Sequence, residues 1–487
     1  MILAYIQIER VLHSARFFGI FLGIVPIDFL PKSGIISNDK KITRVNIMSK
    51  FRKQHMPIEW HEMIDTENII PAAQATLKEK SVLIGRVGLM MLSVGTGAWR
   101  VRASMNKISR ALGVTCNADI GLLSIEYTCI ENGETYTNAL SLNNTGVNTD
   151  KLNELESFTD GFSERADKYS MEQFHMILDK FADMKGNYKA WDLGLASGLA
   201  CCAFTFLLGG GLFEMLGAFV GAGIGNFVRR KLLERHLTLL GNVSLSVAAA
   251  CTAYVLFIKL AELLFGISDV HQAGYICSML FIIPGFPLIT GGIDLSKLDL
   301  RSGLERITYA LIIIVTATMT GWAAASIFRF APANFEEQQI EPIIKLVLRI
   351  VTSFLGVYGF SLMFNSPRRI AVSAGCIGMI ANTLRLEIID LMDMPAGAAA
   401  FIGALAAGLL ASAIKHRIGW PRITLTVPSI VIMVPGMFMY KGIYFIVLND
   451  ISTGALWLTK AFLIVLALPL GLIAARILTD NNFRKSS

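Results

Sequence analysis

The sequence has few charged residues: Asp, Glu, Lys and Arg make up only 17% of its 487 residues, whereas 53% are hydrophobic and the mean hydropathy is +0.55. These values exclude an ordinary soluble globular protein and predict a polytopic protein of the lipid bilayer. The net charge is +7, but the basic residues form short clusters beside apolar runs. That placement is typical of membrane orientation signals, so we expect no nucleic acid as a partner.

Motifs of metal, redox and hydrolytic chemistry are missing too. The seven cysteines form no CxxC pair and no metal-like spacing with histidine, so we expect free thiols, no metal site and no cofactor. The sequence has no GxSxG motif, and His61-Glu62 lacks the second histidine of HExxH. We therefore expect that the protein is not an enzyme. An intramembrane hydrolase or a membrane-tethered sensor is the remoter alternative.

The sequence does contain a helix-breaking Pro-Gly pair twice, each time inside a long apolar run. Pro284-Gly285 and Pro435-Gly436 lie 151 residues apart (435 minus 284), in matching places of two hydrophobic halves. Such a pair frees backbone groups, which is tolerated in a membrane where they face protein or a water-filled cavity. The pattern predicts two discontinuous helices around a transport site near the middle of the membrane. Two kinked packing helices are the alternative.

The expected substrate-binding residues lie at these breaks and in one further span. Asn382 lies deeper in its span than a snorkelling side chain would. Arg385 could hold a substrate carboxylate or pair with Glu387. The full candidate set is Pro284, Gly285, Pro287, Thr290, Gly291, Pro435, Gly436, Tyr440, Asn382 and Arg385.

Two acidic residues are candidates for proton coupling. Asp294 follows the first break and is expected near the cytoplasmic boundary, where partial burial can bring a carboxyl group into the working pH range. Its alternative role is to cap the turn into the next loop. Glu214 lies near the outer start of a span, and local pairing or reaching toward the membrane surface is its alternative.

Residues 1–80 are predicted to be a disordered leader; a signal peptide or an over-extended translation start are the alternatives. Residues 81–188 are predicted to form a small cytoplasmic α+β domain, which begins with one helix that ends at Gly113. Asn132-Gly133 lies between two alternating runs and predicts a β-hairpin. Two amphipathic helices should follow, over residues 151–166 and 171–184.

Ten apolar segments after Ala190 are each near the ~20 residues that a bilayer requires. They are 191–208, 211–228, 243–265, 272–294, 304–328, 343–364, 370–389, 396–414, 424–446 and 455–477. Every second loop between them is basic, which predicts that both termini are cytoplasmic. Five spans per half, 189–330 and 343–478, imply that the second half enters the membrane inverted. An external linker, 331–342, joins the halves, and 479–487 is a cytoplasmic tail.

The sequence resembles the threonine/serine exporter family from about Ser81 to its C-terminus. The resemblance rests on motifs in the α+β domain and in both membrane halves: Trp99-Arg100-Val101, Ala111-Leu112-Gly113, Pro284-Gly285-x-Pro287, Asp294-Leu295, Ser302-Gly303, Phe364-Asn365-x-Pro367-Arg368, Pro421, Pro428, Pro435-Gly436 and Tyr440.

The resemblance implies efflux of small hydroxy amino acids across the inner membrane, driven by the proton gradient or the membrane potential. We therefore expect a multi-pass secondary transporter of antiporter type that exports threonine or serine by alternating access between inverted repeats. A dicarboxylate exporter with a succinate-like substrate is the alternative, and it would require Arg385 and Lys441 to line the cavity. The expected partners are a small zwitterionic or acidic substrate and protons, with a second copy of the chain as a further candidate.

Overall fold

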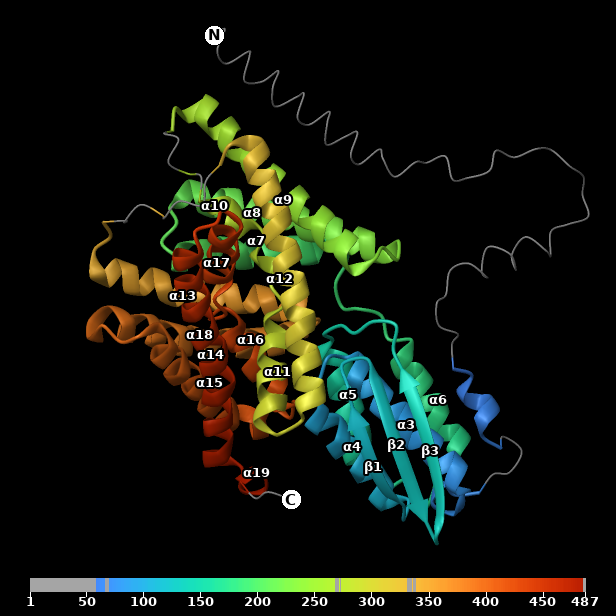
Figure 1. The fold of residues 1–487 in the computed structure, drawn as a ribbon. Coiled ribbons are helices and arrows are strands. Elements are labelled where there is room, and N and C mark those ends of the chain that lie inside the picture. Colours follow the sequence, from blue (N-terminus) through green and yellow to red (C-terminus); the bar gives the residue numbers. More distant parts are fainter. Residues whose placement is uncertain are drawn as a thin grey trace, which may run out of the picture. The chain divides into compact units, whose positions relative to one another are not determined.

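The computed structural model describes residues 58–65, 70–267, 271, 273–330, 335 and 339–484 (Figure 1). The chain divides into two compact units, residues 1–58 and 59–487, and the following description concerns the second. The predicted leader up to residue 57 and most of the predicted linker 331–342 lie outside the described residues.

The first part of this unit combines a small sheet with four helices, and we call it the α+β region. Its elements are η2 (Trp60–Met63), η3 (Ala72–Gln74), α3 (Leu77–Ser93), α4 (Ala98–Ala111), β1 (Thr115–Ile120), β2 (Ser124–Glu131), β3 (Glu134–Ser141), α5 (Thr149–Asp160) and α6 (Met171–Ala182). The strands form an antiparallel sheet in the order β1-β2-β3. Helices α3 and α4 pack on the sheet, and α5 and α6 pack against these two helices (Figure 1).

The β2–β3 hairpin lies where the sequence predicts it. Glu131 pairs with Glu134, so Asn132 and Gly133 form a two-residue turn. Both turn residues have positive φ, 51° and 84°, which this type of tight turn requires and which asparagine and glycine tolerate best. The strand β1 was missing from the prediction.

The first predicted helix differs from the structure at its start and in its middle. It begins at Leu77, inside the predicted leader, because Thr76 and Glu79 form a reciprocal capping box. The single helix up to Gly113 is wrong, because the chain leaves α3 after Ser93 and starts α4 at Ala98. Gly95 has a φ of +85°, which a continuing right-handed helix cannot accommodate.

The core of the α+β region contains a buried histidine beside its aromatic residues. His175 is fully buried on α6, and its Nδ1 lies 2.9 Å from Nη1 of Arg86. Arg86 also forms an ion pair with Asp179. Burial, followed by the nearby Arg86 charge, lowers the pKa of His175 to about 3, so the ring is neutral at physiological pH.

The rest of the unit is helical. Its elements are α7 (Ala190–Leu207), α8 (Leu212–Glu234), α9 (Leu239–Phe265), α10 (Gly274–Ser278), η4 (Leu280–Ile282), α11 (Gly285–Ser296), α12 (Leu300–Phe328), α13 (Pro342–Met363), α14 (Arg368–Met392), α15 (Ala396–Ile418), α16 (Arg422–Val431), α17 (Gly436–Val447), α18 (Ile451–Thr479) and α19 (Asn481–Arg484). Among the described residues, seven helices are long and apolar enough to cross a membrane, or nine spans if each of two bent helix pairs counts as one.

Nine of the ten predicted spans coincide with these helices and bent pairs. The remaining one corresponds to α8, which has 23 residues but carries Glu214, Asn226 and Arg229 and is not among the apolar helices of the described part. For α8, the membrane span therefore stays a prediction.

The final helices of the two halves share one register. Helices α11 and α17 both have 12 residues and begin 151 residues apart, at Gly285 and Gly436. The next helices, α12 and α18, both have 29 residues and begin at Leu300 and Ile451, again 151 residues apart. Because element lengths and spacing agree, the two segments have equivalent backbone paths.

Candidate functional site

Both Pro-Gly pairs break a helix in the same way. Pro284 has φ −80° and ψ 61°, and Pro435 has φ −82° and ψ 55°. The following glycine N–H donates to the carbonyl two residues back, over 2.8 Å at Gly285 and 2.9 Å at Gly436. Each proline is therefore the centre of an inverse γ-turn. The helix axes change direction by 60° at the first break and 51° at the second, so the predicted discontinuous helices are present.

The two breaks pack against each other in a reciprocal manner. A Cβ atom on Gly285 would lie 3.2 Å from Val431 Cγ1 and 3.3 Å from Val434 Cγ2. A Cβ on Gly436 would lie 2.9 Å from Leu280 Cδ2 and 3.2 Å from Ile283 Cγ1. The contact residues of one break are thus the 151-residue equivalents of those of the other. Glycine at both positions allows the broken helices to cross closely.

A small cavity of about 50 Å³ opens beside the second break. This volume has room for a few water-sized molecules. Four of the predicted binding residues line it, namely Asn382, Arg385, Pro435 and Gly436. The other lining residues are Phe204, Leu207, Leu208, Leu386, Ile432, Met433, Val434, Met437, Phe438 and Ile464.

Arg385 is the cationic residue of this cavity. Its Nη1 donates to Asn382 Oδ1 over 3.3 Å, and Asn382 Nδ2 donates to Ser353 Oγ over 2.9 Å. Within the described part of the chain, Arg385 has no acidic partner, and its buried Nε has no hydrogen-bond acceptor. The alternative pairing with Glu387 is wrong, because that carboxylate binds Arg349 at 2.7 Å. The guanidinium is therefore available to an anion.

The other predicted binding residues lie outside the cavity lining. Thr290 Oγ1 donates to Phe286 O within its own helix over 2.9 Å, so its hydroxyl is already occupied. Gly291 packs against α12, and Tyr440 shares a 2.8 Å hydrogen bond with the hydroxyl of Tyr275. The residues concerned are Pro284, Gly285, Pro287, Thr290, Gly291 and Tyr440.

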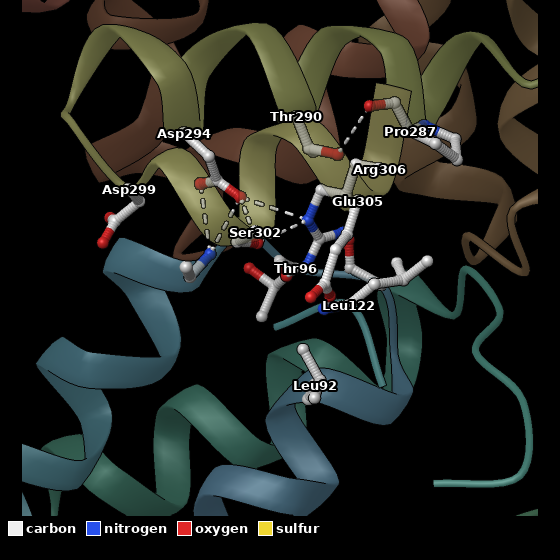
Figure 2. A network of polar contacts seen from close by, with 12 residues as sticks. Leu92, Thr96, Leu122, Pro287, Thr290, Asp294, Asp299, Ser302, Glu305 and Arg306 are labelled. Atoms are coloured by element: carbon white, nitrogen blue, oxygen red, sulfur yellow. Dashed lines mark hydrogen bonds and ion pairs between the residues drawn. The ribbon is translucent and has the colours of Figure 1, made fainter. Parts of the chain in front are cut away.

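Asp294 lies in a different cluster, between the membrane helices and the α+β region (Figure 2). Its carboxylate accepts hydrogen bonds from Ala98 N at 3.1 and 3.2 Å and from Ser302 Oγ at 2.9 Å. It also forms an ion pair with Arg306 Nε at 3.1 Å, and both side chains are almost completely buried. Asp294 thus caps the first turn of α4, and not the turn that follows its own helix.

The Arg306 guanidinium completes this cluster from the other side. Its Nη2 donates to Thr96 O over 2.7 Å, and its Nε also donates to Ser302 Oγ over 3.1 Å. A Cβ on Gly97, the N-cap of α4, would lie 2.6 Å from Asp294 Oδ1. The close approach of carboxylate and helix terminus therefore depends on glycine at this position.

Further contacts join the α+β region to both membrane halves. In the first half, Glu305 accepts from Leu122 N over 2.5 Å, and Arg301 Nη1 lies 2.5 Å from Asp119 Oδ2. In the second half, the loop between α13 and α14 accepts several hydrogen bonds. They include Thr149 N to Phe364 O at 3.0 Å, Asn187 N to Asn365 Oδ1 at 2.7 Å and Tyr188 OH to Ser366 O at 2.7 Å.

Glu214, the second candidate for proton coupling, pairs locally. Its Oε1 lies 2.8 Å from His271 Nδ1, and the carboxyl group is buried. The other oxygen has no hydrogen-bond partner among the described residues. This contact is the local pairing named as the alternative for Glu214, and its role in proton coupling stays a prediction.

Sequence reasoning missed one motif that the structure brings out. Asn382 and Arg385 form an Asn-x-x-Arg motif on α14, and Asn226 and Arg229 form the same motif on α8. The two motifs lie 156 residues apart, as do the first residues of the two helices, Leu212 and Arg368. A search for repeats between the halves would have found it.

The long apolar helices, the two broken pairs and the buried polar residues beside one break define a polytopic membrane protein of transporter type. The chain belongs to the threonine/serine exporter family. The family described as "Putative threonine/serine exporter" matches residues 82–328, and "Threonine/Serine exporter, ThrE" matches residues 349–478. The resemblance seen in the sequence is thereby confirmed, and the protein is an exporter-type membrane transporter.

The chain is also similar to individual curated proteins. It is 25% identical over 243 residues to the "Probable succinate transporter subunit YjjP" of Escherichia coli, covering 48% of this chain and 91% of that protein. The protein of the same name from Klebsiella aerogenes is 25% identical over 48% of this chain and 90% of its own length. The "Pheromone-regulated membrane protein 10" of Debaryomyces hansenii is 24% identical, over 60% of this chain but only 29% of that protein. No solved structure matches the chain significantly.

Proposed function

We propose that this protein is a secondary exporter of small carboxylate-bearing molecules, with threonine and serine as its first substrates, in the inner membrane. The observation that carries the proposal is Arg385, a guanidinium without an acidic partner in the described part of the chain, which lines the cavity beside the Pro435-Gly436 break. Guanidinium groups bind carboxylates in a bidentate manner. Gly436 also begins α17, and a helix N-terminus favours negative charge.

Alternating access between two inverted five-helix halves is the proposed mechanism. In Figure 1, α10 lies above α11 whereas α16 lies below α17, so the chain passes the two breaks in opposite directions. The reciprocal contacts of Gly285 and Gly436 support the same relation, because each glycine contacts residues that precede the other break. Inverted repeats that cross at broken helices allow the halves to exchange conformations around one central site.

The charges of the loops support a cytoplasmic position of the α+β region and of both termini. Basic residues follow every second predicted span, and the α+β region contacts the first turn of α12, where Arg301 lies. Under the positive-inside rule this is the cytoplasmic side. Proton coupling is assigned to Asp294 and Glu214. Protonation of Asp294 would weaken its ion pair with Arg306 and its bond to the α4 terminus, so proton uptake there would alter the contact with the α+β region.

A succinate-like dicarboxylate is the second candidate substrate, favoured by the names of the two bacterial relatives. It needs two cationic partners, and among the described residues Arg385 lines the cavity whereas Lys441 does not. A zwitterion needs one cation together with acceptors for its ammonium group, such as the carbonyl groups of the break. The cavity geometry therefore favours the amino acid.

Efflux from cells loaded with labelled threonine, serine or succinate tests the proposal. We expect efflux of threonine and serine to exceed that of succinate, and Arg385→Gln to lower the rate of threonine efflux about tenfold or more, as expected for a lost charge-assisted hydrogen bond. Arg385→Lys is the matched control and should retain part of the affinity. Preferred efflux of succinate would establish the second candidate, and unchanged kinetics in Arg385→Gln would refute the site.

A further inference from the structure

The two Asn-x-x-Arg motifs occupy equivalent places in the two halves. The starts of α8 and α14 are equivalent, and the helices before them, α7 and α13, also end with the same hydrogen bond. Gly210 N bonds to Thr205 O at 2.9 Å, and Ser366 N bonds to Ser361 O at 3.1 Å. All these pairs are 156 residues apart, and Ser197 and Ser353 stand in the same relation. Asn226 and Arg229 therefore correspond to Asn382 and Arg385 in three dimensions.

The motifs differ in their hydrogen bonds. On α14, Arg385 Nη1 donates to Asn382 Oδ1, and Asn382 Nδ2 donates to a serine hydroxyl. On α8, Asn226 Nδ2 donates to Leu193 O over 2.7 Å, while Asn226 Oδ1 has no partner among the described residues. Because Asn226 is fully buried, an unpaired amide oxygen there is unfavourable and indicates a missing donor.

Arg229 is the donor that the repeat relation supplies. As a residue, Arg229 is half-buried; it interacts electrostatically with Tyr309 of α12 and has no acidic partner within the described ranges. The neighbouring cation Lys231, by contrast, is exposed and pairs with Glu234 at 2.9 Å. Of these two cations of α8, Arg229 is thus the one available to a substrate carboxylate.

We infer that Asn226 and Arg229 form a second carboxylate-binding station, on the opposite side of the crossing from Asn382 and Arg385. The two stations exchange states during transport. In this structure Arg385 of the second half bonds to Asn382, whereas Asn226 Oδ1 of the first half has no partner among the described residues. When the halves exchange conformations, Arg229 bonds to Asn226 Oδ1 and Arg385 leaves Asn382. The inference rests on the proposed exporter function, since the passing carboxylate is the ligand of both arginines.

Accessibility in membrane vesicles tests the placement without requiring transport. Single variants Arg229→Cys and Arg385→Cys are treated with a membrane-impermeant thiol reagent in right-side-out and inside-out vesicles, with the unchanged chain as the background. We expect Arg229→Cys to react from the cytoplasmic side and Arg385→Cys from the external side. Reaction of both from the same side, or of neither, overturns the inference whether or not the protein exports threonine.

Transport kinetics test the role. Arg229→Gln should raise the half-saturation concentration for threonine about tenfold or more when substrate is offered at the cytoplasmic face, and Arg385→Gln should do so at the external face. Lys231→Gln, on the same helix, is the matched control and should leave both values unchanged. If Arg229→Gln behaves like Lys231→Gln while the wild-type protein exports threonine, the second station is refuted and the proposed function stands. If the wild-type protein does not export threonine or succinate, the proposed function fails, and the vesicle labelling still decides the placement.

Discussion

Replacement of Asp294 by asparagine should weaken one contact between the α+β region and the membrane helices and lower the stability of the protein. The substituted amide would keep the size of the side chain but would leave Arg306, which is 1% exposed, without its carboxylate. Removal of one partner of a buried ion pair costs about 3–5 kcal/mol. Arg306 retains Thr96 O and Ser302 Oγ as acceptors, so we expect Asp294→Asn to lower the free energy of unfolding by about 3 kcal/mol, at the low end of that range.

Two measurements check this on the purified full-length chain in detergent micelles. The free energy of unfolding comes from a denaturant titration, and hydrogen exchange at Ala98 and the following amides reports the loss of the cap on α4. The double variant Asp294→Asn/Arg306→Met should recover much of the stability, because it removes the uncompensated charge. A stability of Asp294→Asn within about 0.5 kcal/mol of wild type, with unchanged exchange in α4, would contradict the reasoning.

Three further outcomes follow from the structure. Gly436→Val should lower threonine efflux and stability, because its Cβ would lie 2.9 Å from Leu280 Cδ2; wild-type efflux and melting temperature in this variant would show that the crossing is not close. Gly97→Ala should accelerate hydrogen exchange at the start of α4, because the added methyl group would lie 2.6 Å from Asp294 Oδ1, and unchanged exchange there would speak against the tight cap. The pKa of His175, about 3 instead of 6.5, means that the unfolded chain binds a proton that the folded one does not, so stability should fall as the pH drops from about 6.5 toward 3. At pH 5 the free energy of unfolding, measured by hydrogen exchange in α6, should be about 2 kcal/mol lower than at neutral pH. This pH dependence should vanish in His175→Gln. An equal pH dependence of stability in both proteins would exclude His175 as its source.

Local chemistry explains which parts of the fold were predictable. The Asn132-Gly133 turn and the Pro-Gly breaks depend on the conformational limits of residues that are neighbours in sequence, so their positions were evident. The turn between α3 and α4 was not, because the segments on both sides of Gly95-Thr96-Gly97 continue a helical pattern. Glycine inside such a pattern is compatible with a helix, and the φ of Gly95 in the structure shows the turn.

The candidate site was predictable where its residues break a helix or are polar inside a membrane span. Asn382 and Arg385 stood out because polar residues are costly inside a span, and they do line the cavity. The partners of Asp294 could not be derived, because Ala98 N is 196 residues away in sequence and a backbone donor leaves no trace in composition. Asn226 and Arg229 were missed for another reason: the motif lies near a basic cluster that reads as an orientation signal.

The contacts of the α+β region with both halves have a mechanical consequence. It is anchored to the first half through Asp294, Glu305 and Arg301, and to the second through the loop at Asn365. A rigid-body rotation of one half against the other must therefore break the contacts at one of these two attachments or deform the α+β region between them. If the two halves rotate against each other as proposed, the α+β region would limit that rotation, and a ligand that binds or releases this region would change the angle through which the halves can rotate.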